Sequence, residues 1–311
     1  STWTSAPPTD GLDDVVEQTR DASESLRWLR AGPGGNLTSS SVLLDRSVND
    51  AIVLPGQSRA RIAVLETAAQ NLVMLYELQV GESNPLGRQM TLSMPDGKNV
   101  SWCGMMQGDQ AAAVLADPDR PRLLCYDRTG EGWGPQRSYP TVADIRVIAA
   151  PQAEPGTLLI WSKNAEQLFR CRWEAGRLTY PEPWSVGDEE EEGKILGLGS
   201  VGDTSWWVRK VGARLDLYRW APGDDEPRCT PLEQVGPKAH DVLWIGGDRL
   251  LVKQQHARAV QLVQLADEGV KISMPAHLSG ASLSEFRLLP VAGNLRLGRL
   301  TNGVLQWIGD D

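Results

Sequence analysis

A short phrase of alternating apolar and polar residues, closed by a glycine, recurs along this chain at intervals of about 45 residues. The three clearest copies are LLCYDRTG up to Gly130, LFRCRWEAG up to Gly176 and LDLYRWAPG up to Gly223. The residues five positions before these glycines are Cys125, Cys171 and Tyr218. Alternation with a period of two is typical of β-strands, so the pattern predicts a chain built from repeated strands.

This strand repeat predicts a β-propeller, in which four-stranded sheets pack side by side around an axis. Stretches of small and aliphatic residues suit the innermost positions, because strands that line a narrow channel have little room for bulky side chains. We expect six innermost strands, at residues 50–54, 100–106, 144–149, 194–201, 241–246 and 285–291. Each of the first five is followed by two more regular strands and by a less regular outer strand.

The last repeat provides only three strands before the sequence stops at Asp311. Residues 37–45, which read LTSSSVLLD, form a spare strand at the other end of the propeller. We expect this strand to pair beside residues 304–308, because an unclosed ring leaves bare sheet edges. The predicted fold is therefore an all-β, six-bladed β-propeller that an N-terminal strand closes, with five or seven blades as the alternatives if one division between blades is misplaced.

The first thirty-five residues are predicted to lie outside the propeller, as a flexible lead followed by one amphipathic α-helix. Apolar residues at spacings of three and four run through residues 12–30, and a Gly-Pro-Gly-Gly stretch follows. Such a stripe is typical of a helix that covers a core, and the alternative is a helix that mediates assembly with a partner. The predicted domains are residues 1–35 and residues 36–311.

Composition excludes several classes of function. The net charge is −9, which argues against nucleic acid as a partner, since no basic stripe is available to contact phosphates. The sequence has no run of eighteen apolar residues, so no membrane-spanning helix is predicted. The four cysteines form no C-x-x-C pair, so a zinc site is not expected, and a reducing cytoplasmic location fits them best. No cofactor is predicted.

Charged residues recur where the innermost strands begin, at one mouth of the predicted channel. The set comprises Asp50, Asp144, Asp241, Glu285, Arg146, Arg287 and His240. Carboxylates that converge on an axis favour a cation or a basic ligand. The alternative is that short acidic residues simply begin strands, or that the arginines, two positions further along, form ion pairs with them. The sequence leaves the metal question open.

Aromatic and arginine residues form a second candidate set, near the outer strands. The phrase FRCRWEAG with LTYPEPWSVG resembles a blade of six-bladed sugar-binding propellers of the fucose-lectin type. The resemblance implies a sugar site between blades, made by Arg172, Trp173 and Trp184, with Arg219 and Trp220 in the next blade. Trp133 joins them as a surface-binding candidate. The chain is similar to WD40 proteins in architecture alone, without their G-H and W-D signatures.

The sequence contains no G-x-S-x-G elbow, Walker loop or H-E-x-x-H motif. We therefore expect a non-catalytic propeller that recognises a protein partner or another ligand, as a scaffold or as a module of a larger protein. Two alternatives remain open. One is a lectin-like sugar binder, and the other is a metal-dependent six-bladed propeller hydrolase or lactonase, although the four-residue metal set of such lactonases is not matched.

Overall fold

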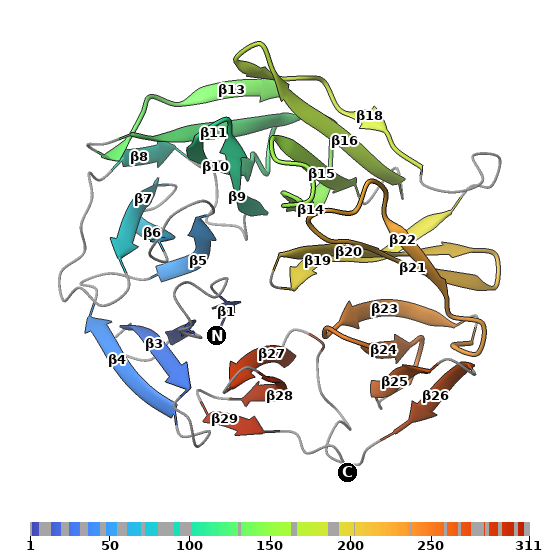
Figure 1. Ribbon diagram of the computed structural model, residues 1–311. Helices are drawn as coiled ribbons and strands as arrows, with labels where there is room; N and C mark the ends of the chain where they lie inside the picture. Colours follow the sequence, from blue (N-terminus) through green and yellow to red (C-terminus); the bar gives the residue numbers. More distant parts are fainter. Residues whose placement is uncertain are drawn as a thin grey trace.

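The computed structural model describes side chains at residues 101–129, 133–162, 167–185, 193–200, 203–236, 238–257, 260–266, 270–274 and 283, and elsewhere gives strands alone. These strands form seven antiparallel sheets around a common centre (Figure 1). In five of the seven sheets the strand nearest the centre comes first in the chain and the others follow outward in sequence order. This arrangement is typical of a β-propeller.

The two sheets drawn in blue and teal contain the first eight strands (Figure 1). The first sheet consists of β1 (Thr2–Ser5), β2 (Asp14–Thr19), β3 (Ser25–Ala31) and β4 (Leu37–Leu43). The second consists of β5 (Val48–Leu54), β6 (Arg61–Ala69), β7 (Leu72–Gln79) and β8 (Met90–Ser93).

The second and third of the next three sheets border the candidate site. One contains β9 (Trp102–Gln107), β10 (Gln110–Ala116), β11 (Arg122–Thr129), β12 (Gly132–Trp133) and β13 (Arg137–Pro140). The second contains β14 (Ile145–Ala149), β15 (Thr157–Ser162), β16 (Gln167–Glu174), β17 (Arg177–Leu178) and β18 (Glu182–Pro183). The third contains β19 (Lys194–Val201), β20 (Thr204–Val211), β21 (Arg214–Trp220) and β22 (Arg228–Pro231).

Two more sheets complete the ring. One contains β23 (Ala239–Trp244), β24 (Arg249–Gln254), β25 (Val260–Ala266) and β26 (Gly269–Ser273). The other contains β27 (Phe286–Val291), β28 (Asn294–Thr301) and β29 (Val304–Trp307). The six innermost strands predicted from the sequence are confirmed as β5, β9, β14, β19, β23 and β27, each within a few residues of its expected bounds.

The predictions for the N-terminal part of the chain are wrong. Residues 12–30 contain the strands β2 and β3 instead of a helix, and β4 pairs with β3 instead of closing the last sheet beside β29. The strands therefore form seven sheets, not six. The apolar residues at 12–30 belong to two short strands and the connection between them. Over such short windows, a helical period fits the pattern as well as an alternating one does.

Side chains from facing sheets fill the spaces between them. Three buried clusters lie in consecutive gaps, and each combines residues of two neighbouring sheets. The adjacent residues Trp206 and Trp207 of β20 belong to different clusters, because neighbouring strand residues point to opposite faces. The strand β20 thus contributes a large aromatic ring to both gaps.

The positions that repeat in sequence also match in structure. Cys125 lies in β11, Cys171 in β16 and Tyr218 in β21, each in the third strand of its sheet and each buried. Both thiols belong to the same cluster, and burial raises the pKa of each to about 12. Since only a thiolate is a strong nucleophile, these cysteines serve packing.

Gly197 is required where β19 approaches the next sheet. A Cβ there would collide with the Val242 carbonyl oxygen and lie 3.0 Å from the Trp206 ring. We expect Gly197→Ala to lower the free energy of unfolding by about 1–3 kcal/mol, because an added carbon in a filled gap forces backbone shifts. Gly199→Ala is the matched control, since its nearest neighbour is a side chain at 3.2 Å. Equal losses in urea denaturation for the two variants would contradict the prediction.

Candidate functional site

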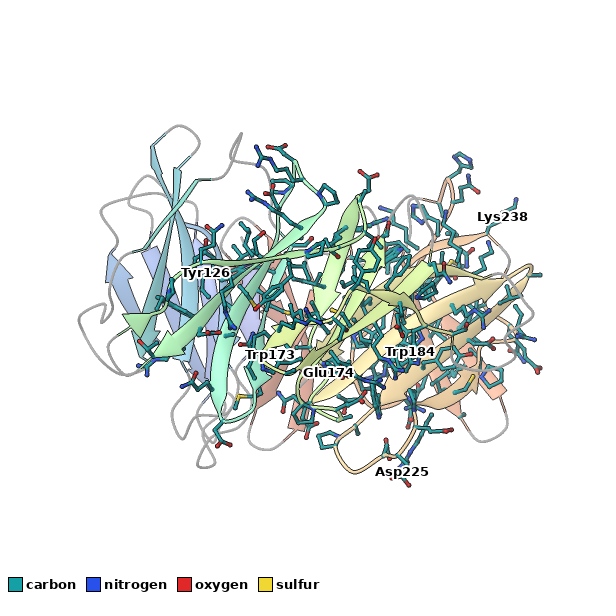
Figure 2. All side chains as sticks on the ribbon, turned by 90° about the horizontal axis from the view of Figure 1, so that it is seen from above. Tyr126, Trp173, Glu174, Trp184, Asp225 and Lys238 are labelled. Atoms are coloured by element: carbon teal, nitrogen blue, oxygen red, sulfur yellow. The ribbon has the colours of Figure 1, made fainter. Side chains whose placement is uncertain are left out.

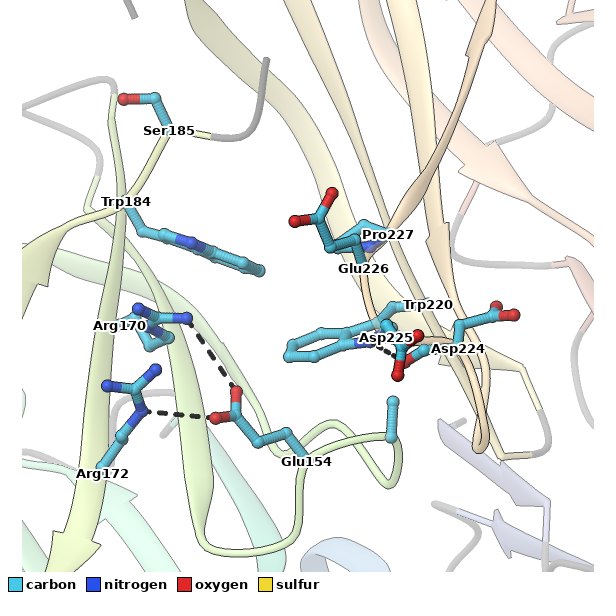
Figure 3. A pocket seen from close by; sticks show the side chains of 11 residues that line it. Glu154, Arg170, Arg172, Trp184, Ser185, Trp220, Asp224, Asp225, Glu226 and Pro227 are labelled. Atoms are coloured by element: carbon cyan, nitrogen blue, oxygen red, sulfur yellow. Dashed lines mark hydrogen bonds and ion pairs between the residues drawn. The ribbon is translucent and has the colours of Figure 1, made fainter.

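A pocket of about 620 Å³ lies between the sheet of β14–β18 and the sheet of β19–β22 (Figure 3). One wall, from the first sheet, is made by Ala153, Glu154, Arg170, Arg172, Trp184 and Ser185. The other wall, from the end of β21 and the connection to β22, is made by Trp220, Asp224, Asp225, Glu226 and Pro227. In the side view of Figure 2, Asp225 lies at one face of the ring and Lys238 lies at the opposite face.

The two arginines reach the pocket because β16 alternates. Arg170 and Arg172 are two residues apart, so both project from the same face of the strand, whereas Phe169 and Cys171 project from the other face into a buried cluster. Backbone hydrogen bonds fix this end of the strand. The Arg172 amide donates to Thr179 Oγ1 at 2.9 Å, and the Thr179 amide donates to the Arg172 carbonyl at 2.8 Å.

Glu154 provides a carboxylate between the two guanidinium groups. It belongs to the turn before β15, where the Thr157 amide donates to its carbonyl oxygen at 3.1 Å. Its Oε1 lies 3.3 Å from Arg172 Nε, and its Oε2 lies 3.9 Å from an Arg170 Nη atom. The distances are longer than those of charge-assisted hydrogen bonds, which leaves the guanidinium groups with capacity for a ligand.

Burial also shapes the electrostatics of Arg170. Desolvation lowers its pKa most, and the nearby charge of Arg172 lowers it further, while Glu154 and Glu182 act in the opposite direction. The guanidinium of Arg170 lies 4.9 Å from the centre of the Trp184 ring, a distance that suits a cation–π contact. This ring contact holds the Arg170 guanidinium in position beside the pocket.

Two tryptophans form the aromatic part of the pocket. The ring centres of Trp184 and Trp220 are 5.5 Å apart, and the Trp184 amide donates to the Leu168 carbonyl at 2.8 Å. Behind them, Trp207 lies 5.3 Å from Trp184 and stacks on Tyr218. Figure 3 shows the Trp184 and Trp220 rings projecting into the pocket from its two walls. Such rings provide a flat apolar surface beside the charged groups.

Asp224 holds the far wall in place. Its carbonyl accepts a hydrogen bond from Trp220 Nε1 at 3.1 Å, and its carboxylate accepts one from the Ala221 amide at 3.3 Å and another from Arg228. Its side chain is only 12% exposed. The next two acidic residues, Asp225 and Glu226, are exposed. The far wall thus combines one mostly covered, paired carboxylate with two that face solvent.

The neighbouring gap, between the sheets of β9–β13 and β14–β18, repeats these residue types in a filled form. Arg137 lies 4.5 Å from the centre of the Trp173 ring, and Tyr139 packs edge-on against the same ring. Arg137 donates to Asp127 and, at 2.8 Å, to Gln107 Oε1. The arginine of this gap is therefore bound by the protein itself.

The structure brings together three residues of the aromatic and arginine set, namely Arg172, Trp184 and Trp220. The others lie elsewhere. Trp173 belongs to the filled gap, Trp133 is buried, and Arg219 donates to the Gly247 carbonyl at 3.3 Å and to Thr230 at 3.0 Å. Sequence reasoning missed Arg170 and Glu154. The spacing of Arg170 and Arg172 was a usable signal, whereas Glu154 is placed by a turn that the sequence does not specify.

The channel-mouth residues lie at the starts of the inner strands. His240 Nδ1 is 3.0 Å from the Lys253 carbonyl oxygen, and the Arg146 guanidinium lies 4.6 Å from the centre of the Trp161 ring. Glu285 and the side chains of Asp50 and Arg287 lie outside the described residues. Within the described part, no group of three or more His, Cys, Asp or Glu side chains could hold a metal ion.

The strand register changes how these acids align. A β-bulge interrupts the pairing between Val48 and Asp50, between Ile145 and Val147, and between Ala239 and Asp241. Asp241 therefore corresponds to Asp50 and to Val147, not to Asp144. Asp144 precedes its strand, with a φ of 53°. The sequence could not reveal this offset, because each bulge inserts one residue without a distinctive pattern.

Asp241 gives a test of the mouth's electrostatics. Burial raises the pKa of its carboxyl group, although Arg146 and His240 act to lower it. Because the folded state then binds the proton more tightly, the contribution of Asp241 to stability is greatest at low pH and is lost as the pH rises through the folded-state pKa of this group. We expect Asp241→Asn to stabilise the protein at pH 7 by up to about 1 kcal/mol, and the gain to shrink toward pH 4. Urea denaturation at both pH values checks this, with the exposed Asp109→Asn as control.

The pocket can bind a ring with one apolar face and several hydroxyl groups. The indoles offer the apolar surface, the guanidinium groups donate hydrogen bonds, and the carboxylates accept them. Glu154 can also accept a proton from a water molecule beside a bound ester. The arrangement thus provides a base and two cations around one binding surface.

No protein-family model matches the chain, and no curated protein sequence matches it. The periplasmic gluconolactonase PpgL of Pseudomonas aeruginosa superposes with a TM-score of 0.54 and 15% identity, over 95% of this chain and 87% of that one. A Bacteroides uniformis protein, provisionally described as a 6-phosphogluconolactonase, has a TM-score of 0.53 and 11% identity over 89% of this chain and 86% of that one. A Bacteroides fragilis protein with the same provisional description has a TM-score of 0.53 and 9% identity, over 88% and 82%.

These similarities contradict the predicted role as a non-catalytic, protein-binding scaffold. Three structures that align along most of the chain are described as lactonases, which agrees with the hydrolase alternative. At 9–15% identity, the similarity shows a shared fold. No helix among the described residues is long and apolar enough to cross a membrane, and the cytoplasmic location stays a prediction.

Proposed function

We propose that this protein hydrolyses the lactone of a sugar acid in the pocket between the sheets of β14–β18 and β19–β22. The observation that carries the proposal is the position of Glu154 between Arg170 and Arg172, at 3.9 and 3.3 Å, next to the facing Trp184 and Trp220 rings. The descriptions of three structures with this fold as gluconolactonase or 6-phosphogluconolactonase support the choice of reaction.

The binding step uses the aromatic pair. The less polar face of a sugar-lactone ring packs on the Trp184 indole, and its hydroxyl groups exchange hydrogen bonds with the arginines and carboxylates of the two walls. A pocket of about 620 Å³ accommodates one such ring together with the water that attacks it. The lactone carbonyl then faces the side of the pocket that holds Arg170 and Arg172.

The chemical step is the hydrolysis of an ester. Glu154 accepts a proton from water as the water oxygen bonds to the carbonyl carbon, and the guanidinium groups stabilise the resulting oxyanion. The bond from the carbonyl carbon to the ring oxygen then breaks, and the proton on Glu154 passes to that oxygen as it becomes a hydroxyl group. The product is the open-chain acid, and Glu154 returns to its carboxylate form. Every step uses side chains of this chain.

The test is a direct assay on the purified protein. We expect hydrolysis of D-glucono-1,5-lactone, followed as acid release in a pH-stat, to be faster than the spontaneous reaction and to saturate with substrate. A panel of five- and six-membered sugar lactones locates the preferred ring. If every lactone in the panel hydrolyses at its spontaneous rate, the proposal is wrong. Tyr180→Ala, which removes an exposed aromatic ring outside the pocket, should leave the rate unchanged.

A further inference from the structure

The charges of the pocket are unevenly divided between its walls. The arginine wall carries two cations, and Glu154 lies within 4.0 Å of both, so much of their charge is already offset. The far wall carries three consecutive acids, Asp224, Asp225 and Glu226, of which Asp224 is bound by Arg228. The remaining two carboxylates are exposed, and neither has an ion-pair partner within the described residues.

Figure 3 shows how these groups face one another. Asp225 and Glu226 lie on the opposite wall from Arg170 and Arg172, with the Trp184 and Trp220 rings between them. A ligand that stacks on the indoles therefore has guanidinium groups on one side and unpaired carboxylates on the other. Neutral hydroxyl groups satisfy both sides, since they accept from guanidinium and donate to carboxylate.

A phosphate group meets different conditions in the same space. It brings a charge of about −2, which the far-wall carboxylates repel. The arginine wall gives limited compensation, because a phosphate must compete with Glu154 for the guanidinium groups. Repulsion between like charges that share a solvated pocket amounts to roughly several-fold in affinity for each carboxylate.

We propose that the pocket selects an uncharged polyhydroxy lactone and discriminates against the same lactone carrying a phosphate. This inference rests on the proposed function, whose substrate class it narrows. The acidic far wall is the part of the site that determines the selection, and Asp225 and Glu226 are its specificity-determining residues. They act through charge and take no part in the chemical step.

The experiment compares kcat/KM for D-glucono-1,5-lactone and for its 6-phosphate in the wild-type protein and in Asp225→Asn/Glu226→Gln. We expect the wild type to prefer the unphosphorylated lactone by about tenfold or more. The double variant should raise the ratio of kcat/KM for the phosphorylated lactone to kcat/KM for the unphosphorylated one by about five- to tenfold, because it removes the negative charges and keeps amide oxygens that accept hydrogen bonds from hydroxyl groups. Asp203→Asn/Glu233→Gln, which removes two exposed charges outside the pocket, is the matched control.

A binding measurement separates this inference from the proposed reaction. Glucose and glucose 6-phosphate, which are not hydrolysed, are titrated while tryptophan fluorescence is followed. If the protein binds glucose more tightly than glucose 6-phosphate but hydrolyses no lactone, the proposed reaction is refuted and the proposed selection by charge still stands. The inference is overturned if the protein prefers the phosphorylated compounds, or if the double variant leaves the ratio of the two kcat/KM values unchanged. It is also overturned if the protein binds neither sugar and hydrolyses neither lactone.

Discussion

Replacing Glu154 by glutamine is expected to lower kcat for sugar-lactone hydrolysis by about 100- to 10,000-fold, the usual effect of losing a general base. The amide keeps the size of the side chain and can still contact the arginines, but it cannot accept the proton of the attacking water. Since binding depends mainly on the indoles and the far wall, KM should change by much less. Initial rates over a range of lactone concentrations measure both constants.

The matched control for this variant is Glu182→Gln. Glu182 belongs to the same sheet, its charge also acts on Arg170, and it does not line the pocket. Similar losses of kcat in both variants would show that the general charge near Arg170 matters, and not a base at position 154. Folding should be nearly unaffected in either case, because partly exposed ion pairs contribute about 1 kcal/mol or less.

Trp207→Ala is expected to lower the free energy of unfolding by about 3–5 kcal/mol, the largest loss of stability among the variants considered. Trp207 is 2% exposed, stacks on Tyr218 at 5.3 Å and supports Trp184 from behind. Its removal leaves a cavity that the rigid sheets on either side cannot close. Chemical denaturation followed by far-ultraviolet circular dichroism measures the loss.

Two comparisons make this prediction specific. Trp207→Phe keeps an aromatic ring in the gap and should lose less than half as much stability, whereas Tyr180→Ala removes an exposed ring and should lose almost none. Because Trp184 rests on Trp207, the alanine variant should also bind sugars more weakly at temperatures where it is still folded. A stability loss below that of Trp207→Phe would contradict the packing role.

The sequence predicted the repeated part of the fold well because that part depends on local patterns. The strand β19 was expected at its observed bounds, since small and aliphatic residues between turn signals specify an inner strand. The helix predicted over residues 12–30 was wrong because a period of two and a period of 3.6 are hard to separate over strands as short as β2. The prediction that residues 37–45 close the last sheet was wrong for the same reason, since it left out β3, the strand with which they pair.

The candidate site was predictable only in part, for a related reason. Arg172, Trp184 and Trp220 were identified from the repeated phrase and its continuation, which are local features. The contact between the two walls depends on how far the turn carrying Glu154 and the connection after Trp220 extend toward each other. That distance follows from the packing of Trp207 between two sheets, which no single stretch of sequence encodes.

The opposite placement of Asp225 and Lys238, seen in Figure 2, has a practical consequence. Because the acidic wall of the pocket and the start of β23 lie at different faces, the exposed Lys238 amine offers an attachment point remote from the ligand. A molecule attached to a sensor chip through that amine presents the pocket to the solution, so the chip surface does not obstruct ligand binding.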